Sequence, residues 1–346
     1  MVTSVLVTGA SGFVGRAVCE KALALGIKVR GSHRSPGTQS LVPQGVEKIQ
    51  IASVNNNTDW STALIGVDVV IHLAGRVHIA KDSVKDPLAT YRAVNAAGTS
   101  RLAKMAVSAG VRRLVYVSTI KVNGEQTVTA PFTETDSPRP QDAYAISKWE
   151  SEQALHRIGA ESGLETVILR PPLVYGQGVG ANFLKLLSLV RRRIPLPLAS
   201  VPNRRSLIYV KNLADALLTS ATHPRANGRT FLVSDGDDIS TPELVRRIAE
   251  AMELPPRMFR CSARLLGVAA KIIGKSAEAH RLLSPLVIDS KRIRYETSWV
   301  PRYTMSQGLK ETVRWYLANE PSVPKVCGPP GEFVHGLDAS AERETR

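Results

Sequence analysis

Tyr144 and Lys148 are a candidate proton-transfer pair. Residues four apart lie on one face of a helix, and among the eight tyrosines of the chain only Tyr144 has a lysine four residues later. A tyrosine with a pKa near 10 is a poor base at neutral pH, but a nearby ammonium group lowers that pKa. Such a pair could exchange a proton with a hydroxyl group while a cofactor carries hydride. An ordinary helix surface is the alternative, so the surrounding sequence must decide.

A glycine-rich loop, "TGASGFVG", lies near the N-terminus between an apolar run and a helical pattern. The first glycine of such a loop permits a tight turn, the second lets the backbone approach a pyrophosphate, and the third lets the helix pack close to the sheet. The helix N-terminus offers N–H groups and a positive dipole end to phosphates. The loop predicts dinucleotide binding rather than a purely structural turn. The residues expected at the cofactor are Gly9, Ser11, Gly12, Phe13, Val14 and Gly15.

The end of the second predicted strand reads "RGSHRSPG" and has no acidic residue. An NAD site usually has an acid there for the ribose hydroxyls, whereas an arginine accommodates a 2′-phosphate. His33 stands where the acid would be, and Arg34 follows it. This favours NADP over NAD as the cofactor. The alternative is that Arg30 and Arg34 are exposed loop cations.

Short apolar runs alternate with helical patterns through the first two-thirds of the chain. This alternation predicts a parallel sheet with helices on both faces, a doubly wound α/β fold. The expected helices cover Val14 to Gly26, Tyr91 to Ala109 and Ala143 to Glu161. The expected strands are Val5 to Gly9, Ile27 to Ser32, Val46 to Ile51, Val67 to Gly75, Val111 to Thr119 and Leu164 to Pro171.

The composition changes after Pro172, where the segments become rich in Gly and Pro. We therefore expect a dinucleotide-binding domain over residues 1–172 and a smaller C-terminal substrate lobe over residues 173–318. A segment of about 206–235 is expected to return to the first domain. Residues 319–346 show no regular spacing of apolar residues, which is typical of a mobile tail.

The net charge of +15 over 346 residues favours anionic partners. The basic clusters lack interleaved aromatics and no nucleic-acid-binding motif is present, so we expect no nucleic-acid partner. The three cysteines and seven histidines show no metal-ligand spacing, and we expect no metal. No signal peptide or membrane-spanning segment is evident, which favours a cytoplasmic protein. Leu265 to Gly274 reads as a core helix, with a helix lying on a membrane as the alternative.

Six motifs follow one another in a distinctive order. They are the glycine loop, "HLAG" (His72 to Gly75), "YRAVNAAGT" (Tyr91 to Thr99), "YVST" (Tyr116 to Thr119), "YAISK" (Tyr144 to Lys148) and "LRPPLVYG" (Leu169 to Gly176). Together they resemble the extended short-chain dehydrogenases that act on nucleotide sugars, the UDP-glucose 4-epimerase-like, NAD-dependent epimerase/dehydratase superfamily. The resemblance covers residues 1 to 318. It implies a Rossmann-type fold with NAD(P) and makes Tyr144 and Lys148 the catalytic pair.

The same resemblance implies further site residues. Thr119 would hydrogen-bond the substrate oxygen that Tyr144 protonates, and Asn95 would support the hydrogen bonds of the active site, although a capped helix interior is the alternative for Asn95. Leu73, Ala74, Gly75 and Pro171 would line the cofactor. For the substrate, Asn182 and Phe183 match the place that binds the UDP portion. Arg205 and Arg281 match two diphosphate-binding arginines, a role that suits the planar guanidinium.

The type of reaction depends on the residues after Thr119. The family's 4,6-dehydratases have Asp-Glu there, whereas this chain has Ile120 and Lys121, so we expect no dehydratase. A closer resemblance, carried by "STIKVNGE", "RPPLVYG", "NRRSLIYVKNLAD" and "FLVSDGDDISTPEL", is to bacterial O-antigen (lipopolysaccharide) enzymes that reduce a UDP-4-keto-6-deoxy-N-acetylhexosamine to UDP-N-acetylquinovosamine. This 4-keto reductase is the favoured function. A UDP-sugar 4-epimerase with tightly bound NAD is the first alternative.

Two other function classes stay open. A non-catalytic NADP-sensing protein could keep the fold, but the intact set of Thr119, Tyr144 and Lys148 argues against it. A dehydrogenase acting on a steroid-like alcohol is less favoured, because the paired arginines suit a diphosphate. Family members often dimerise through two long helices, which implies a homodimer through Tyr91 to Ala109 and Ala143 to Glu161.

Overall fold

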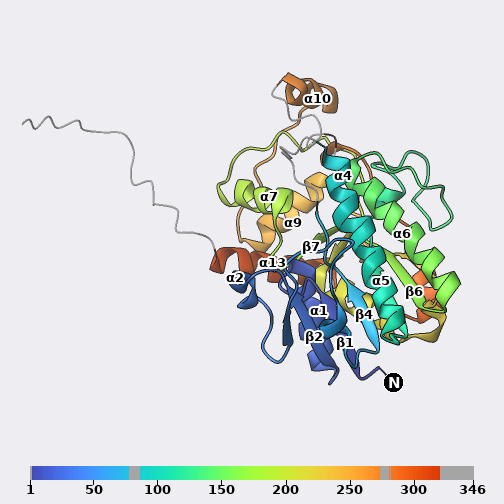
Figure 1. Ribbon diagram of the computed structural model, residues 1–346. Coiled ribbons are helices and arrows are strands. Elements are labelled where there is room, and N and C mark those ends of the chain that lie inside the picture. The colour runs from blue at the N-terminus through green and yellow to red at the C-terminus, as the bar shows by residue number, and fades with distance from the viewer. Residues whose placement is uncertain (1, 78–85, 273–279, 281, 320–346) are drawn as a thin grey trace, which may run out of the picture.

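The computed structural model describes residues 2–77, 86–272, 280 and 282–319 (Figure 1). The predicted diphosphate ligand Arg281 and nearly all of the predicted tail lie outside these residues. Seven parallel strands form one sheet in the order β3-β2-β1-β4-β5-β6-β9. The strands are β1 (Ser4–Thr8), β2 (Lys28–His33), β3 (Glu47–Gln50), β4 (Val69–His72), β5 (Arg113–Val117), β6 (Glu165–Arg170) and β9 (Thr230–Leu232). This confirms the doubly wound parallel fold.

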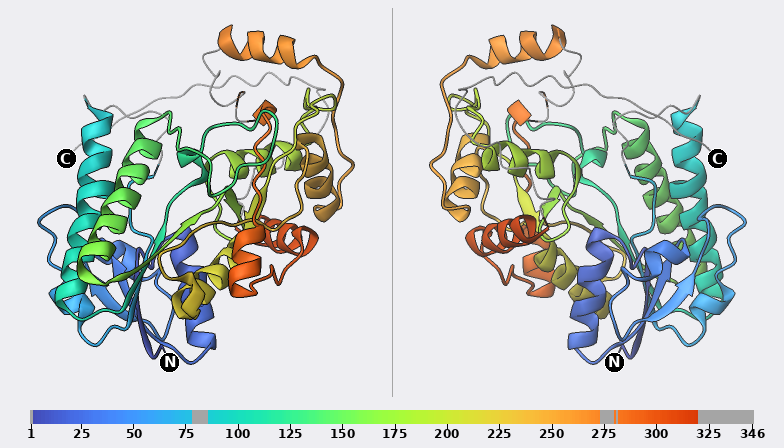
Figure 2. Two further views of the ribbon diagram at one scale, coloured as in Figure 1. Left: turned by 90° about the vertical axis from the view of Figure 1, so that its right-hand side faces the viewer. Right: turned by 90° about the vertical axis from the view of Figure 1, so that its left-hand side faces the viewer.

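Helices cover both faces of the sheet because its strands are apolar on both sides. Val5 and Val7 of β1 pack in one cluster with helices α1 (Phe13–Ala24) and α8 (Val210–Thr222). Leu6, which points to the other face, packs in a second cluster with α3 (Ser61–Leu64), α5 (Gly98–Ser108) and α6 (Ala143–Ser162). Figure 2 shows the two helix layers on either side of the strands. Cys19 of α1 is buried in the first cluster, where it packs as a small core residue.

A second lobe forms around a two-stranded parallel sheet of β7 (Leu173–Tyr175) and β8 (Leu207–Tyr209). Its own apolar cluster joins α7 (Ala181–Arg191), α9 (Thr241–Ala251) and α13 (Met305–Ala318). The chain leaves this lobe through β8 and α8 and then adds β9 to the edge of the large sheet, beside β6. The remaining elements are α2 (Pro36–Gln39), α4 (Pro87–Tyr91), the π-helical turn η1 (Arg92–Ala97), the 3-10 turns η2 (Ile120–Val122) and η3 (Pro224–Ala226), α10 (Ala263–Ile272) and α12 (Lys291–Thr297).

Two sequence predictions need correction. The segment from Tyr91 to Ala109 is not one continuous α-helix, because η1 inserts a π-helical turn between α4 and α5. The predicted core helix from Leu265 to Gly274 is wrong. Helix α10 lies at the upper edge of the molecule in Figure 1, and Leu265, Val268 and Ile272 are exposed. Periodicity showed an amphipathic helix but not which of its faces is covered.

Candidate active site

The glycine loop connects β1 to α1 and is tightly folded. Gly9 has a φ of +70°, and its N–H donates to Ser32 Oγ at 3.2 Å. A Cβ on Gly15 would lie 2.1 Å from the Gly9 carbonyl oxygen, so only glycine lets the helix start this close to the turn. Helix α1 begins after Gly12 with no acidic residue in its first turn, which suits an anion. The loop therefore fits a dinucleotide pyrophosphate at Gly9, Ser11, Gly12, Phe13, Val14 and Gly15.

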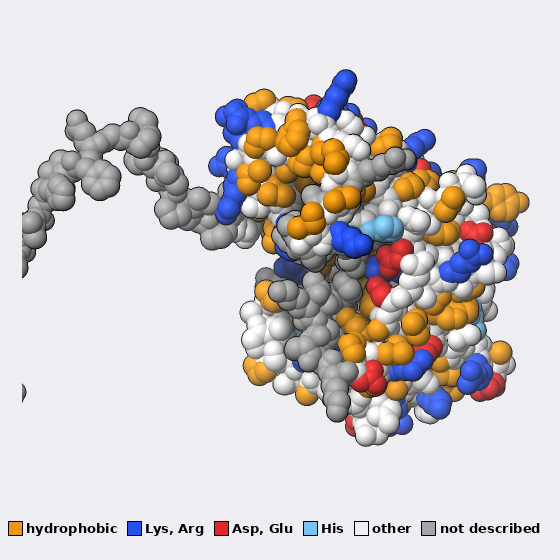
Figure 3. Space-filling model, turned by 90° about the horizontal axis from the view of Figure 1, so that it is seen from above, with side chains coloured by type: hydrophobic (Ala, Val, Ile, Leu, Met, Phe, Trp, Pro, Cys, Tyr) orange, Lys and Arg blue, Asp and Glu red, His pale blue; other side chains and the backbone are white. Residues whose placement is uncertain are grey.

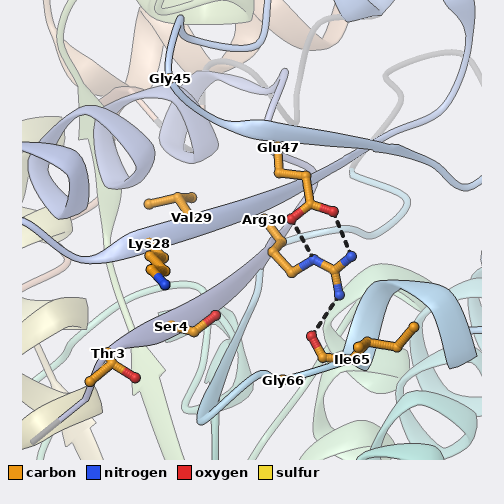
Figure 4. A pocket seen from close by; sticks show the side chains of 9 residues that line it. All are labelled: Thr3, Ser4, Lys28, Val29, Arg30, Gly45, Glu47, Ile65 and Gly66. Carbon is orange, nitrogen blue, oxygen red and sulfur yellow. Dashed lines mark hydrogen bonds and ion pairs between the residues drawn. The ribbon is translucent and has the colours of Figure 1, made fainter.

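The end of β2 gives less support to an NADP site than the sequence suggested. His33 is buried, and its Nδ1 lies 3.1 Å from the Ser35 carbonyl oxygen, whereas Arg34 is exposed. Arg30 is not a loose loop cation. It makes a bidentate ion pair with Glu47 at 2.9 and 2.6 Å and also bonds the Ile65 carbonyl oxygen. These contacts hold Arg30 in a pocket at the start of the strands, away from the glycine loop (Figure 4).

A buried hydrogen-bond chain fixes the end of β4. Thr8 Oγ1 lies 2.7 Å from His72 Nδ1 and accepts the N–H groups of Leu73 and Ala74 at 3.0 Å. His72 Nε2 lies 2.9 Å from Thr99 Oγ1. Burial, together with the charge of Lys148, lowers the pKa of His72 to about 3, so its ring is neutral. This network positions the backbone of residues 73–75, the predicted cofactor wall.

Asn95 is buried in the π-helical turn η1 and connects two site segments. Its Oδ1 accepts the Arg76 N–H at 2.8 Å, and its Nδ2 donates to the Arg76 carbonyl at 3.1 Å and to Ser147 Oγ at 2.9 Å. A Cβ on Gly75 would lie 2.9 Å from Asn95 Oδ1, so the glycine makes room for the amide. Asn95 therefore joins the segment after β4 to the start of α6, and its role in the active site stays a prediction. Its main-chain carbonyl accepts Ser151 Oγ of α6, which helps to hold the π-helical geometry.

Tyr144 and Lys148 lie one turn apart at the start of α6, and Lys148 is buried. Burial lowers the pKa of Lys148 to about 7, although the charge of Glu152 opposes this shift. The Lys148 ammonium lies 4.1 Å from the centre of the Tyr116 ring, which attracts it by a cation–π interaction. Tyr144 packs edge to face on Tyr91, with 6.0 Å between ring centres.

The expected lowering of the Tyr144 pKa is wrong for this arrangement. Burial is the largest influence and raises the pKa of the Tyr144 hydroxyl, and the charge of Asp142 raises it further. Both shifts favour an uncharged pair of Tyr144 and Lys148. Sequence spacing could not reveal this outcome, because it depends on how deeply the pair is buried.

Thr119 lies at the end of β5, beside Pro171. The adjacent Ile120 N–H donates to the Pro171 carbonyl at 3.0 Å, and the Ser118 N–H donates to Leu169 at 2.8 Å. Thr119 Oγ1 accepts the Lys121 N–H at 3.3 Å, which leaves its own hydroxyl hydrogen able to donate. These bonds bring two sequence-predicted residues, Thr119 and Pro171, together.

An ion-pair network that sequence reasoning missed joins the Thr119 segment to α6. Lys121 Nζ lies 2.8 Å from Glu125 and 2.6 Å from Asp142. Asp142 also caps α6, because its Oδ1 accepts the Ala145 N–H at 2.7 Å. The lysine that replaces the dehydratase acid thus neutralises a carboxylate two residues before Tyr144. The "DAYAISK" stretch shows that Asp142 can cap the helix, but its ion-pair partner Lys121 lies 21 residues earlier and cannot be found from local sequence.

The predicted substrate residues lie in the second lobe. Asn182 is exposed at the start of α7, whereas the Phe183 ring is 3% exposed and stacks on Tyr175. Phe183 is therefore part of the apolar cluster of the second lobe. Arg205 donates to the Ser284 carbonyl oxygen at 2.7 Å. Burial lowers the pKa of the Arg205 guanidinium, and the charge of Glu125 opposes that shift. Because Glu125 also pairs with Lys121, Arg205 lies near the Lys121 network.

Comparisons with known proteins show the family and the fold. The model of the NAD dependent epimerase/dehydratase family matches residues 5–234. A UDP-glucose 4-epimerase of Vibrio cholerae is 38% identical over 319 residues, which are 92% of this chain and 96% of that protein. An N-acetyl-alpha-D-glucosaminyl-diphospho-ditrans,octacis-undecaprenol 4-epimerase of Escherichia coli O157:H7 is 25% identical and covers 90% and 95%. The solved UDP-glucose 4-epimerase of Thermotoga maritima has the same fold, with a TM-score of 0.74 at 22% identity over 91% of this chain and 99% of that one.

Proposed function

This chain belongs to the NAD dependent epimerase/dehydratase family, and we propose that it moves hydride at C4 of a UDP-sugar with Tyr144 as the acid–base group. The observation that carries the proposal is the joining of three segments by buried bonds. Thr8, just before the glycine loop, accepts the N–H groups of Leu73 and Ala74, and Asn95 bonds both the Arg76 backbone after them and Ser147 of α6. Tyr144 and Lys148 lie one turn apart on that helix. A bound nicotinamide would accept hydride from C4 or return it there.

The residues of the chain would handle the proton and the position of the sugar. As hydride leaves C4, Tyr144 would take the C4 hydroxyl proton while its own hydroxyl proton passes to the uncharged Lys148 amine, and both protons would move back when hydride returns. Thr119 would donate a hydrogen bond to the same oxygen. Lys148, with a pKa of about 7, can hold or release a proton close to neutral pH. Asn95, through Ser147 and the Arg76 backbone, would keep α6 aligned with the cofactor wall.

We place 4-epimerisation first among the possible outcomes. The Vibrio cholerae relative named as a UDP-glucose 4-epimerase is similar over nearly the whole chain. The replacement of the dehydratase acids by Ile120 and Lys121 leaves no acid at those two positions for elimination. Both points favour a reaction in which hydride leaves C4 and returns to it.

Reduction of a UDP-4-keto-6-deoxy-N-acetylhexosamine is the second candidate. One observation favours it. The end of β2 has no acid to hold the ribose of a permanently bound NAD, and Arg34 is exposed there. A reductase must exchange its cofactor at each turnover, which a looser ribose site would permit. The family is NAD dependent, so a preference for NADP rests on Arg34 alone.

The test uses the purified full chain. Nuclear magnetic resonance would follow UDP-glucose and UDP-N-acetylglucosamine with NAD, and absorbance would follow NADH or NADPH with the UDP-4-keto sugar. Interconversion of C4 epimers without net cofactor use supports the epimerase. Stoichiometric loss of reduced cofactor would instead support the reductase. If neither reaction occurs while cofactor still binds, the NADP-sensing alternative replaces both.

The substrate diphosphate would meet the second lobe. Arg205 is held with its guanidinium beside Ser284 and near Glu125, and Asn182 is exposed at the start of α7. We propose that these two residues contact the UDP portion, and that the buried Phe183 only supports the start of α7. An Arg205→Lys variant keeps the charge but loses the planar fork, so its KM should rise about tenfold with little change in kcat.

We also propose a homodimer. Helices α5 and α6 lie side by side on one flank of the molecule, where Arg92 and Glu150 form an exposed ion pair (Figure 1). A second copy could pack on this flank. Gel filtration with light scattering would give the mass of a dimer, and the mass of a monomer would refute the proposal.

A further inference from the structure

Helix α10 presents an apolar stripe to solvent. Leu265, Val268 and Ile272 are 64%, 58% and 80% exposed. Their spacing of three and four residues places them on one face of the helix. Leu266, which falls outside this stripe, is partly buried against the core of the second lobe. The helix is therefore attached by one side and bare on the other.

Further apolar side chains are exposed on the segment that precedes the helix and on the segment paired with it. Phe259 is 50% exposed, and its N–H donates to the Leu196 carbonyl at 3.0 Å. The Leu196 N–H in turn donates to the Arg257 carbonyl at 2.9 Å, and Ile194, two residues earlier, is 40% exposed. The backbone bonds hold these two segments side by side. We call Ile194, Phe259, Leu265, Val268 and Ile272 the α10 surface.

Basic residues accompany the α10 surface. The sequence from Leu254 to Ile272 has four basic residues, Arg257, Arg260, Arg264 and Lys271, and no acidic residue. Arg257, Arg260 and Lys271 are exposed, and so are Arg192 and Arg193 just before Ile194. The nearest acid in the chain before this stretch is the exposed Glu253. Figure 3, seen from above, shows hydrophobic side chains grouped with Lys and Arg side chains at the border of this part of the molecule.

Helix α10 also projects beyond its surroundings. It lies at the end of the molecule opposite the N-terminus in both views of Figure 2, so a flat surface could reach it without meeting the sheet. In the described part of the chain no helix is long and apolar enough to cross a membrane. An apolar stripe with flanking cations suits a helix that lies in the headgroup region instead.

We propose that the α10 surface docks the protein onto a bilayer that contains anionic lipids. The apolar side chains would enter the boundary between headgroups and acyl chains, and the flanking cations would meet lipid phosphates. A protein partner is less favoured, because the exposed side chains form a narrow stripe with a positive border rather than a broad apolar patch. The inference does not depend on the proposed function, since binding to lipid needs no turnover.

Flotation of the full chain with vesicles tests the proposal. Vesicles of phosphatidylcholine with phosphatidylglycerol should carry the protein upward, and vesicles of phosphatidylcholine alone should carry much less. The L265S/V268S variant should lose binding by about tenfold or more, because it removes two apolar side chains that would be buried in the lipid. The R257Q/R260Q variant should also lose about tenfold or more, since each cation near an anionic surface strengthens binding by about fivefold.

Matched control variants come from the opposite end of the molecule. Ile65→Ser changes a 68% exposed apolar residue, and Lys28→Gln changes an exposed cation, both beside the pocket of Figure 4. Neither should alter flotation, and circular dichroism should show every variant folded.

Three outcomes would overturn the proposal. The first is an absence of binding to anionic vesicles, and the second is binding that both α10 variants leave unchanged. The third is a vesicle-free oligomer in gel filtration that L265S/V268S dissociates, because the surface would then be covered by a second copy. An inactive enzyme that still floats would refute the proposed function and leave this inference intact.

Discussion

The start of helix α6 and helix α10 suit opposite surroundings. At the start of α6, polar side chains are buried and bonded to other segments, as Ser147 is to Asn95 and Asp142 is to Lys121. On α10, large apolar side chains such as Leu265 and Ile272 are exposed. A buried polar group loses its partner when one residue changes, whereas an exposed apolar side chain loses none. Substitutions at the start of α6 should therefore change chemistry and stability, and those on α10 should change neither.

The largest effect is expected for Tyr144→Phe, which removes the acid–base hydroxyl. Activity should fall by about a thousandfold, within the usual contribution of a positioned acid–base group. Kinetics on the preferred UDP-sugar would measure it. Tyr295→Phe is the matched control, because Tyr295 is 85% exposed on α12. Equal losses of activity in Tyr144→Phe and Tyr295→Phe would show that Tyr144 has no special role in the reaction.

The buried Lys148 should make stability depend on pH. Its pKa is about 7 in the folded protein and 10.5 ordinarily. Between these values the unfolded chain binds more protons, so the stability of the wild type rises with pH through this window. Lys148→Met should thus stabilise the fold at pH 6 by on the order of a few kcal/mol, with the gain fading towards pH 10.

Thermal unfolding at both pH values would measure this gain. Lys310→Met, at an exposed position of α13, serves as the control and should show no such pH dependence. If Lys148→Met raised the stability equally at pH 6 and pH 10, the pKa of Lys148 would not be lowered in the folded protein.

Gly15→Ala should loosen the cofactor loop. The added Cβ would meet the Gly9 carbonyl oxygen at 2.1 Å, so backbone must move, at a cost of about 2 kcal/mol. Fluorescence titration should show weaker NAD binding, and the melting temperature should drop. In Gly37→Ala the new Cβ has no neighbour within 4 Å, and both quantities should stay near wild type. Unchanged NAD binding in Gly15→Ala would count against the loop as the pyrophosphate site.

The smallest effect is expected for Lys121→Met. The charged and titratable groups around Tyr144 are Asp142, Lys148, Tyr91 and Tyr116, and Asp142 is neutralised by Lys121. Without that lysine, the Asp142 charge should raise the pKa of Tyr144 further, lower kcat about tenfold at neutral pH and move the pH profile upward. Asp142→Asn in the same chain keeps the helix cap and should restore much of the rate.

The control for this pair is Lys211→Met. It breaks the ion pair of Lys211 with Glu311 at 2.6 Å, away from the Tyr144 segment. This variant should leave the pH profile in place. If kcat fell in Lys121→Met while its pH profile stayed in place, Lys121 would have a structural role and would not act through the pKa of Tyr144.

Local patterns predicted much of the fold and part of the site. The strands, the glycine loop and the Tyr144–Lys148 spacing depend on neighbouring residues, so the sequence alone revealed them. The π-helical turn could not be foreseen, because Ser151, 56 residues away, bonds the Asn95 carbonyl. The Lys121–Asp142 pair and the raised pKa of Tyr144 likewise arise from long-range packing. The exposure of α10 depends on what the rest of the fold leaves uncovered.

The central claim is tested most directly with a UDP-sugar that carries deuterium at C4. The full chain and NAD would be incubated with UDP-glucose and, separately, with UDP-N-acetylglucosamine so labelled, and mass spectrometry would locate the label. Our account predicts a C4 epimer that keeps the deuterium in the wild type, and no epimer in Tyr144→Phe. An epimer that has lost its label to water would contradict hydride transfer at C4.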